Sequence, residues 1–396
     1  MKVKRQTVLA VMLMMAVLTL VSTRLRADVG ICGGASITLP FMDVPNTNTF
    51  FCSIAEAYFS GLSNGTTATT YSPGDPVPRE QMAAFVSRTM DQSLKRGSRR
   101  AALKQFWTPT SADDLGLTTV GNTPRFVASD GADLWVANAG GTVSRVRASD
   151  GKLLDTWTGA VGAYAVLSAK GLIFVTGQTV PGRLYQIDPT QPSGAVTTVS
   201  STLGNSSTGM SFDGERIWTA NSFGTVSIVT LNPLSVSTVS AGFAQPWGLL
   251  YDGSNMWLTD IGTTPGKLFK LDSNGAIIQT VTMDTRPYWA VFDGTNIWVP
   301  NADSNTLTVV RASTGTVLAT LTGNGLDRPR TAAFDGERIV VANTGDRVSL
   351  WHAADLTPLG FVTTPVSANN FGVFGACSDG LNFWITLAGT NQLARF

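Results

Sequence analysis

A short pattern returns along the chain at a nearly constant spacing. In most copies an Asp-Gly pair forms a turn, and a tryptophan follows five residues after the aspartate inside a strand-like stretch, as in Asp293-Gly294 and Trp298. The anchor residues of the copies are separated by steps of 39 to 44 residues, and they are Asp130, Lys170, Asp213, Asp252, Asp293, Asp335 and Asp379. A fixed period near forty with strand-forming sequence in every unit is the signature of a β-propeller.

Each repeat has room for four short strands. In the repeat around Asp293, the strand-like stretches are residues 287–292, 297–301, 306–311 and 317–321. Glycine, asparagine and aspartate stand between them, where a hairpin turn needs a positive φ. The sequence therefore predicts small antiparallel sheets arranged as blades.

The two ends of the repeat region predict how the ring closes. The last repeat stops at residues 392–396, which read as a third strand with no fourth strand after it. Residues 115–121 are strand-like but have no earlier strands before them. A fourth strand supplied by this segment, beside Leu393, leaves no unpaired sheet edge at the junction. We therefore expect an all-β, seven-bladed propeller over residues 114–396, closed by its N-terminal strand.

The repeats resemble the YVTN and NHL classes of propeller. The second strands that carry this resemblance end in Ala-Asn at Ala137-Asn138, Ala220-Asn221 and Ala342-Asn343. The resemblance implies a fold more than an activity. One structural position holds a tryptophan in five repeats, and these are Trp135, Trp218, Trp257, Trp298 and Trp384. Because the residue recurs at one position, we expect it to pack between neighbouring sheets.

The N-terminus has the features of an export signal. Lys2, Lys4 and Arg5 precede an apolar stretch over residues 7–22, and Ala27 offers a cleavage point before Asp28. The rival interpretation is a retained membrane anchor. No second long apolar stretch follows. We therefore expect residues 1–27 to be a signal peptide and the mature chain to be exported, without a transmembrane domain, to the cell surface, envelope or exterior.

Residues 28–95 have a different, helical pattern. Apolar residues at helical spacing predict helices over 50–62 and 79–94, joined by a turn-rich loop. A basic linker over residues 96–113 follows. Cys32 and Cys52 flank the start of this module, and export makes a disulfide between them possible; two buried thiols are the alternative.

This module resembles a single S-layer homology module. The segments that carry the resemblance are Phe41-Met42-Asp43-Val44, residues 57–65, Tyr71-Ser72-Pro73 and residues 78–85. The resemblance implies attachment to envelope polysaccharide or peptidoglycan. The second helix of that family usually opens with Thr-Arg-Ala-Glu, and the matching residues here are Pro78, Arg79, Glu80 and Gln81. Arg79 is therefore the candidate contact for an anionic glycan.

In propellers of this kind, ligands usually bind at the channel mouth, near the start of the first strands and the end of the second strands. The first set of candidates is Arg125, Thr208, Trp247, Tyr288, Arg330 and Phe374, and the second set is Asn138, Asn221, Asp260, Asn301 and Asn343. Arginines with aromatics and amides fit a carboxylate, a sugar or an extended peptide. The alternatives are that the asparagines cap turns and that the aromatic residues plug the channel.

Charge and acid-base residues favour a binding role over catalysis. The formal net charge is +1, which gives no overall field toward nucleic acid. In the repeat region the glutamates Glu215 and Glu337 lie in turns, and His352 lies at or beside an outer strand. We therefore expect a non-catalytic platform for a glycan, a protein or a peptide, without cofactor or metal. The alternatives are a structural surface-layer component and a propeller lactonase or lyase.

Overall fold

The computed structural model describes residues 28–32, 35–59, 63–79, 81–83, 85–86, 89, 116–364 and 372–396. The expected signal peptide (1–27) and basic linker (96–113) lie outside these residues. Internal contacts divide the chain into two compact units, Met1–Arg96 and Gly97–Phe396. Among the described residues, no helix has the length and apolar character needed to cross a membrane.

The N-terminal unit packs a two-stranded sheet and a helix around a small core. Strands β1 (Val29–Cys32) and β2 (Ala35–Thr38) pair antiparallel, and helix α2 covers Phe51–Phe59. The described positions 79, 81–83, 85–86 and 89 are also helical, within the second predicted helix. Among the described residues of this unit, the buried apolar ones are Leu39, Phe41, Val44, Phe51, Ile54 and Ala55.

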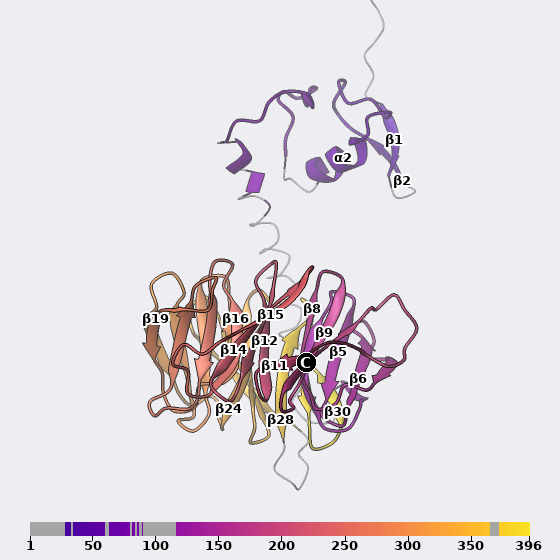
Figure 1. Ribbon diagram of the computed structural model, residues 1–396. Coiled ribbons are helices and arrows are strands. Elements are labelled where there is room, and N and C mark those ends of the chain that lie inside the picture. Colours follow the sequence, from indigo (N-terminus) through magenta and orange to yellow (C-terminus); the bar gives the residue numbers. More distant parts are fainter. Residues whose placement is uncertain are drawn as a thin grey trace, which may run out of the picture. The chain divides into compact units, whose positions relative to one another are not determined.

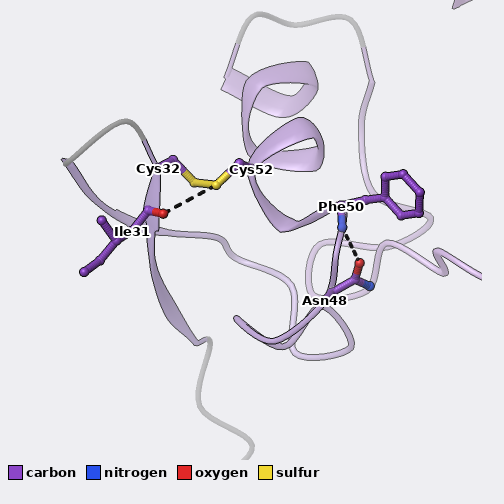
Figure 2. Close-up of a disulfide and its surroundings, with 5 residues drawn as sticks. All are labelled: Ile31, Cys32, Asn48, Phe50 and Cys52. Carbon is purple, nitrogen blue, oxygen red and sulfur yellow. Dashed lines mark hydrogen bonds between the residues drawn. A yellow bond between two sulfur atoms is a disulfide. The ribbon is translucent and has the colours of Figure 1, made fainter.

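A disulfide joins the strand and the helix of this unit. Cys32 ends β1, Cys52 lies in the first turn of α2, and their Cα atoms are 5.5 Å apart (Figure 2). Asn48 lies just before the helix, and its Oδ1 accepts the Phe50 N–H at 2.8 Å. Such a side chain satisfies a donor that the helix start leaves unpaired. A disulfide restricts the unfolded chain, which matters most where the core is small.

The second unit contains seven four-stranded antiparallel sheets. The first three blades are β4 (Pro124–Ser129), β5 (Asp133–Asn138), β6 (Thr142–Arg147) and β7 (Leu153–Thr158); β8 (Ala163–Ala169), β9 (Leu172–Gly177), β10 (Gly182–Ile187) and β11 (Thr197–Leu203); and β12 (Ser207–Phe212), β13 (Ile217–Asn221), β14 (Thr225–Leu231) and β15 (Leu234–Val239).

The next three blades are β16 (Pro246–Tyr251), β17 (Met256–Asp260), β18 (Lys267–Leu271) and β19 (Ile277–Thr282); β20 (Val291–Phe292), β21 (Asn296–Asn301), β22 (Thr306–Arg311) and β23 (Thr316–Leu321); and β24 (Pro329–Phe334), β25 (Arg338–Asn343), β26 (Arg347–His352) and β27 (Pro358–Thr363). The seventh blade holds β28 (Val373–Ser378), β29 (Phe383–Leu387), β30 (Gln392–Arg395) and β3 (Gly116–Thr119).

Burial within a blade is greatest in the second strand and least in the fourth. The second strands β5 and β25 are buried at every position, the inner strand β4 only in part, and the fourth strand β27 is exposed at nearly every position. Second strands contact sheets on both faces, so they lack the alternation of a half-exposed strand.

Strand β3 closes the ring as the sequence predicts. It pairs antiparallel with β30, and Thr118 lies opposite Leu393. The Val120 N–H donates to the Asn391 carbonyl at 2.9 Å, which extends the pairing by one residue. Figure 1 shows the yellow last sheet meeting the magenta first sheet, and β28 contacts β4 there.

The recurring aspartate and tryptophan are joined by a hydrogen bond. In five blades the indole Nε1–H donates to the aspartate Oδ2 at 2.7 Å, and the pairs are Asp130–Trp135, Asp213–Trp218, Asp252–Trp257, Asp293–Trp298 and Asp379–Trp384. Each ring then packs on the next blade; Trp298, for example, lies in one cluster with Ile339 and Val341. The expected packing between sheets is confirmed. In the sixth blade, Arg338 takes the place of the indole and donates to Asp335.

The inner strand of the fifth blade is less regular than its sequence predicts. The predicted strand covers 287–292, but β20 comprises only Val291–Phe292. Pro287 and Trp289 form isolated bridges instead, and the Trp289 bridge is to Thr331 in the next blade. The Trp289 N–H donates to the Arg330 carbonyl at 3.0 Å, and the Trp289 carbonyl accepts the Ala332 N–H at 3.1 Å, so the backbone here bonds to the next blade and not to its own second strand.

We predict that removing β3 destabilises the propeller. A chain starting at Asn122 loses the four residue pairs of β3 with β30, so its free energy of unfolding should fall by about 2–6 kcal/mol, at about 0.5–1.5 kcal/mol for each hydrogen bond. Hydrogen exchange of the β30 amides should also rise. Denaturant unfolding and exchange measure both effects against a control chain starting at Gly116. Equal stability of the two chains would show that the pairing does not close the ring.

Candidate ligand-binding site at the ring centre

The inner strands of the seven blades begin around one point. In each blade the first residue of the inner strand pairs with the last residue of the second strand. The inner strand then has one more residue than the second strand before regular pairing resumes, which is a β-bulge. A β-bulge of this kind redirects the side chains beside it. The second residues of the inner strands are Arg125, Tyr164, Thr208, Trp247, Tyr288, Arg330 and Phe374.

Glycines let neighbouring inner strands approach closely at the next position. A Cβ atom on Gly375 would lie 2.5 Å from the Arg125 carbonyl oxygen, and one on Gly209 would clash with the Trp247 carbonyl oxygen. No larger residue fits at these two positions without moving the backbone. The tight approach brings side chains from separate blades into contact.

Aromatic side chains from five blades fill the ring centre. Phe126 and Trp289 follow the second positions of their strands, and Trp289 has ring contacts with every other aromatic residue of the group. Its ring stacks on Tyr288 with centroids 5.4 Å apart and an angle of 15° between the planes. We call the complete set the central cluster; it comprises Arg125, Phe126, Tyr164, Trp247, Tyr288, Trp289, Arg330 and Phe374. The alternative that aromatic residues plug the channel agrees with this arrangement.

Two arginines of the central cluster lie against these rings; a third arginine outside it, Arg286, has its guanidinium carbon 5.7 Å from the Tyr288 centroid and forms an ion pair with Asp303. The Arg330 guanidinium carbon is 4.1 Å from the centroid of Phe374 and 4.8 Å from that of Tyr288, while that of Arg125 is 4.6 Å from the centroid of Phe374. A cation–π contact contributes about 0.5–2 kcal/mol, more when water is excluded. Within the described ranges, no ion pair includes Arg330.

Burial and like charge perturb the titration of this group. Burial lowers the pKa of Arg125, Tyr164 acts in the opposite direction, and the positive charge of Arg330 lowers the pKa further. Burial raises the pKa of Tyr164 to about 12, although Arg330 and Arg125 both favour its ionised form. Hydrogen bonding toward Arg330 also favours the ionised form of Tyr164, but burial outweighs both effects. The tyrosine therefore stays neutral at physiological pH.

Several buried N–H donors of the central cluster have no acceptor. Arg330 Nε, Trp247 Nε1 and Trp289 Nε1 are shielded from solvent and form no hydrogen bond within the part of the chain that the structure describes. A buried donor left unsatisfied costs about 1–3 kcal/mol. Native proteins keep few such groups, so each one needs a reason.

The predicted second set of site residues does not join this cluster. Asn138, Asn221, Asp260, Asn301 and Asn343 are at most 1% exposed. The amides donate to hydroxyls of their own blades, as Asn221 Nδ2 does to Ser227 Oγ at 3.0 Å. The Asp260 carboxylate accepts backbone N–H groups from Ala244, Gln245 and Gly262. These side chains hold loops in place, in agreement with the alternative that the asparagines cap turns, and a ligand role for the five residues stays a prediction.

The other titratable candidates lie apart from the ring centre. Glu215 and Glu337 occupy the turns between the first two strands of their blades. His352 ends β26, opposite the end of the blade where Asn343 lies, and its Nδ1 is 2.8 Å from Asp355 Oδ1. Thr208 is fully buried, and its hydroxyl donates to the Trp247 carbonyl at 2.9 Å.

In the N-terminal unit, Asp43 joins two of the segments that carry the S-layer homology resemblance. Its carboxylate accepts the backbone N–H groups of Tyr71 and Ser72 at 2.7 to 3.1 Å. Burial opposes ionisation, but these N–H groups prevail and lower the pKa of Asp43. A cleft of about 340 Å³ opens beside the same loop, lined by Asn64, Tyr71, Pro76, Gln81 and Phe85 among others. The candidate residue Arg79 is exposed, and no described ion pair joins it to Asp75.

Three members of the central cluster are absent from the sequence-based list. Tyr164 lies in a blade whose inner strand has an extra residue and no initial proline, so counting back from Lys170 does not reach it. Phe126 and Trp289 occupy third positions, which the bulge brings toward the centre. The bulge has no residue signature in the sequence, although glycine at this position in three other blades hints at crowding.

Comparison with solved structures agrees with this fold. A chain of Kuenenia stuttgartiensis hydrazine synthase is similar with a TM-score of 0.60 and 16% identity, over 69% of this chain and 95% of that one. The WD40 β-propeller domain of Doa1 is similar with a TM-score of 0.58 and 15% identity, over 71% of this chain and 94% of that one. No protein-family model matches the chain, and no curated protein matches it. The chain is thus a seven-bladed β-propeller protein by fold.

We predict that Tyr164 makes the propeller sensitive to alkaline pH. Because the folded-state pKa of about 12 exceeds the ordinary value of 10, the unfolded chain releases the proton first as pH rises. Stability is then fully present below pH 10 and falls between pH 10 and 12. Tyr164→Phe should reduce this fall, as urea unfolding across that range would measure. The same substitution at Tyr251, outside the cluster, is the control, and identical pH slopes for Tyr164→Phe and the unmodified chain would contradict the prediction.

Proposed function

We propose that the protein is exported to the cell surface or envelope, where the N-terminal unit attaches it to envelope polysaccharide and the propeller is a non-catalytic binding platform. The observation that carries the proposal is the central cluster. Six of the seven inner strands bring two arginines and six aromatic rings to one point, where buried donors have no acceptor. A ligand that supplies acceptors resolves this cost.

The arrangement of the cluster supports recognition of an external ligand. Some members of the cluster are partly exposed, namely Arg125, Arg330 and Trp247. The rings that they contact are buried, and these are Tyr164, Tyr288 and Phe374. Partly exposed polar groups over a rigid aromatic base are typical of specific binding sites. The base is rigid because its rings come from separate blades of a closed ring.

The N-terminal unit supports the attachment half of the proposal. Its disulfide suits an oxidising compartment outside the cytoplasm. Its cleft, beside Tyr71 and Gln81, lies between the loop and the helix that carry the S-layer homology resemblance. Arg79 is exposed at the start of the same helical stretch, where it can reach an anionic glycan.

We expect the ring centre to carry the binding activity of the propeller. A glycan and peptide array probed with the mature chain should give bound ligands, and Arg125→Ala combined with Arg330→Ala should abolish them, because both cations of the cluster are removed. The control combines Arg147→Ala with Arg183→Ala, two exposed positions on β6 and β10. Binding unchanged by the first pair would place the site elsewhere.

We expect attachment to depend on the N-terminal unit. The mature chain should sediment with isolated envelope of its source organism, and deletion of residues 28–104 should abolish this while leaving the ring of residues 116–396 closed. Arg79→Ala should weaken co-sedimentation, and Arg79→Lys should preserve more of it because the charge remains. Equal sedimentation of the deletion variant and the full mature chain would contradict the attachment role.

A further inference from the structure

We infer that the central cluster binds the carboxylate of an acidic sugar, a hexuronate unit of an oligosaccharide or polysaccharide. This inference rests on the proposed function, because it takes the ring centre as the binding site of the propeller. It adds the chemical class of the ligand. The charge, the unpaired donors and the aromatic surfaces of the cluster each point to one part of that ligand.

The charge of the cluster calls for an anion. Arg330 lies 4.1 Å from Phe374, 4.8 Å from Tyr288 and 5.5 Å from Trp289, measured from its guanidinium carbon to the ring centroids. No described carboxylate forms an ion pair with it. Arg125 adds a second positive charge over the same phenylalanine. A carboxylate matches the planar fork of an arginine and gains strength where water is excluded.

The unsatisfied hydrogen-bonding groups of the cluster narrow the class of ligand further, because the three named below are all donors. Arg330 Nε, Trp247 Nε1 and Trp289 Nε1 have no acceptor and are closed to solvent, so a bound ligand reaches them only when the partly exposed Arg330 and Trp247 side chains turn outward. An ionised carboxylate is acceptor-only and offers lone pairs on two oxygens. Sugar hydroxyls accept as well as donate.

The aromatic surface accounts for the rest of a sugar unit. The Trp247 ring is partly exposed and lies 5.7 Å from Tyr288 and 5.8 Å from Trp289, between centroids. A pyranose ring has an apolar face of C–H groups beside its polar substituents. This face can pack on an aromatic surface while the carboxylate reaches the arginine. One hexuronate thus uses the charge, the donors and the rings together.

The test is calorimetric titration of the mature chain with trigalacturonate. Three further probes define the chemistry: its fully methyl-esterified form, neutral maltotriose, and N-acetylphenylalanine as a carboxylate of peptide type. We expect binding of trigalacturonate alone. Arg330→Gln should weaken it about tenfold or more, since a charge-assisted contact of about 1.5–3 kcal/mol is lost. Arg330→Lys should weaken it less, and Arg183→Gln on β10 should leave it unchanged.

Trp247→Phe guards against a folding artefact at Arg330. It keeps an aromatic ring and removes one N–H donor, so a several-fold loss of affinity with an unchanged melting temperature supports the inference. If the methyl ester binds as tightly as trigalacturonate, the cluster does not recognise the carboxylate. If N-acetylphenylalanine is the one probe that binds, the ligand is not a sugar. In both cases loss on Arg330→Gln leaves the ring centre as the binding site. If array ligands bind the chain but none responds to Arg330→Gln, the proposed function of the ring centre fails together with the inference.

Discussion

The pairing of β3 with β30 is the interaction on which the rest of the propeller depends. Residues at the two ends of the repeat region meet there, with Gly116 opposite Arg395 and Thr119 opposite Gln392. Once the last blade is complete, it can dock on the first blade. The Thr386 hydroxyl donates to the Arg125 carbonyl at 2.7 Å across that junction. Without closure, Arg125 and Phe374 would belong to opposite ends of an open array.

Closure also explains why the ring centre has unusual chemistry. Inner strands that converge on one point have little room, and glycines at Gly209 and Gly375 permit the approach. In the first and fifth blades the bulge directs two successive side chains inward, Arg125 with Phe126 and Tyr288 with Trp289. Aromatic rings fill most of this space, and their packing surrounds the two arginines. The Arg330 guanidinium lies against the faces of Tyr288 and Phe374, and its Nε has no acceptor among the described residues.

Much of the fold follows from the sequence because the repeats are regular. The constant Asp-Gly spacing predicts seven blades, and the incomplete last repeat predicts the role of the segment beside Leu393. The Asp–Trp hydrogen bonds give the physical reason for the pattern, since the aspartate in five blades caps a turn and also holds the indole of the second strand. Where the pair is missing, as at Lys170, the repeat is harder to align.

The site is less predictable than the fold. Arg125, Trp247, Tyr288, Arg330 and Phe374 share a position set by the repeat, so the sequence identifies them. Whether an asparagine at a strand end faces a ligand or its own blade depends on hydroxyls several residues away, such as Ser227 for Asn221. Simple spacing does not encode that choice. Trp289 shows a further limit, because its place in the cluster arises from a backbone irregularity that joins its strand to the next blade.

The two units of the chain differ in what stabilises them. A closed ring of seven sheets leaves no open junction between its first and last blades. The N-terminal unit has a core of few residues and adds the Cys32–Cys52 disulfide and the Asp43 carboxylate, which holds the loop at Tyr71. A small core buries too little apolar surface to be stable alone, so the N-terminal unit needs these additional links.

Disulfide trapping across the closing strands tests this view most directly. Thr119→Cys and Gln392→Cys would place thiols on directly opposed residues, in a chain whose free thiol Cys377 is replaced by alanine. We expect mild oxidation to give an intramolecular cross-link in nearly every molecule, and none when Thr119→Cys is combined with Ser235→Cys on β15. Failure of the first pair to cross-link, or cross-links only between separate chains, would contradict a ring closed by β3 and β30.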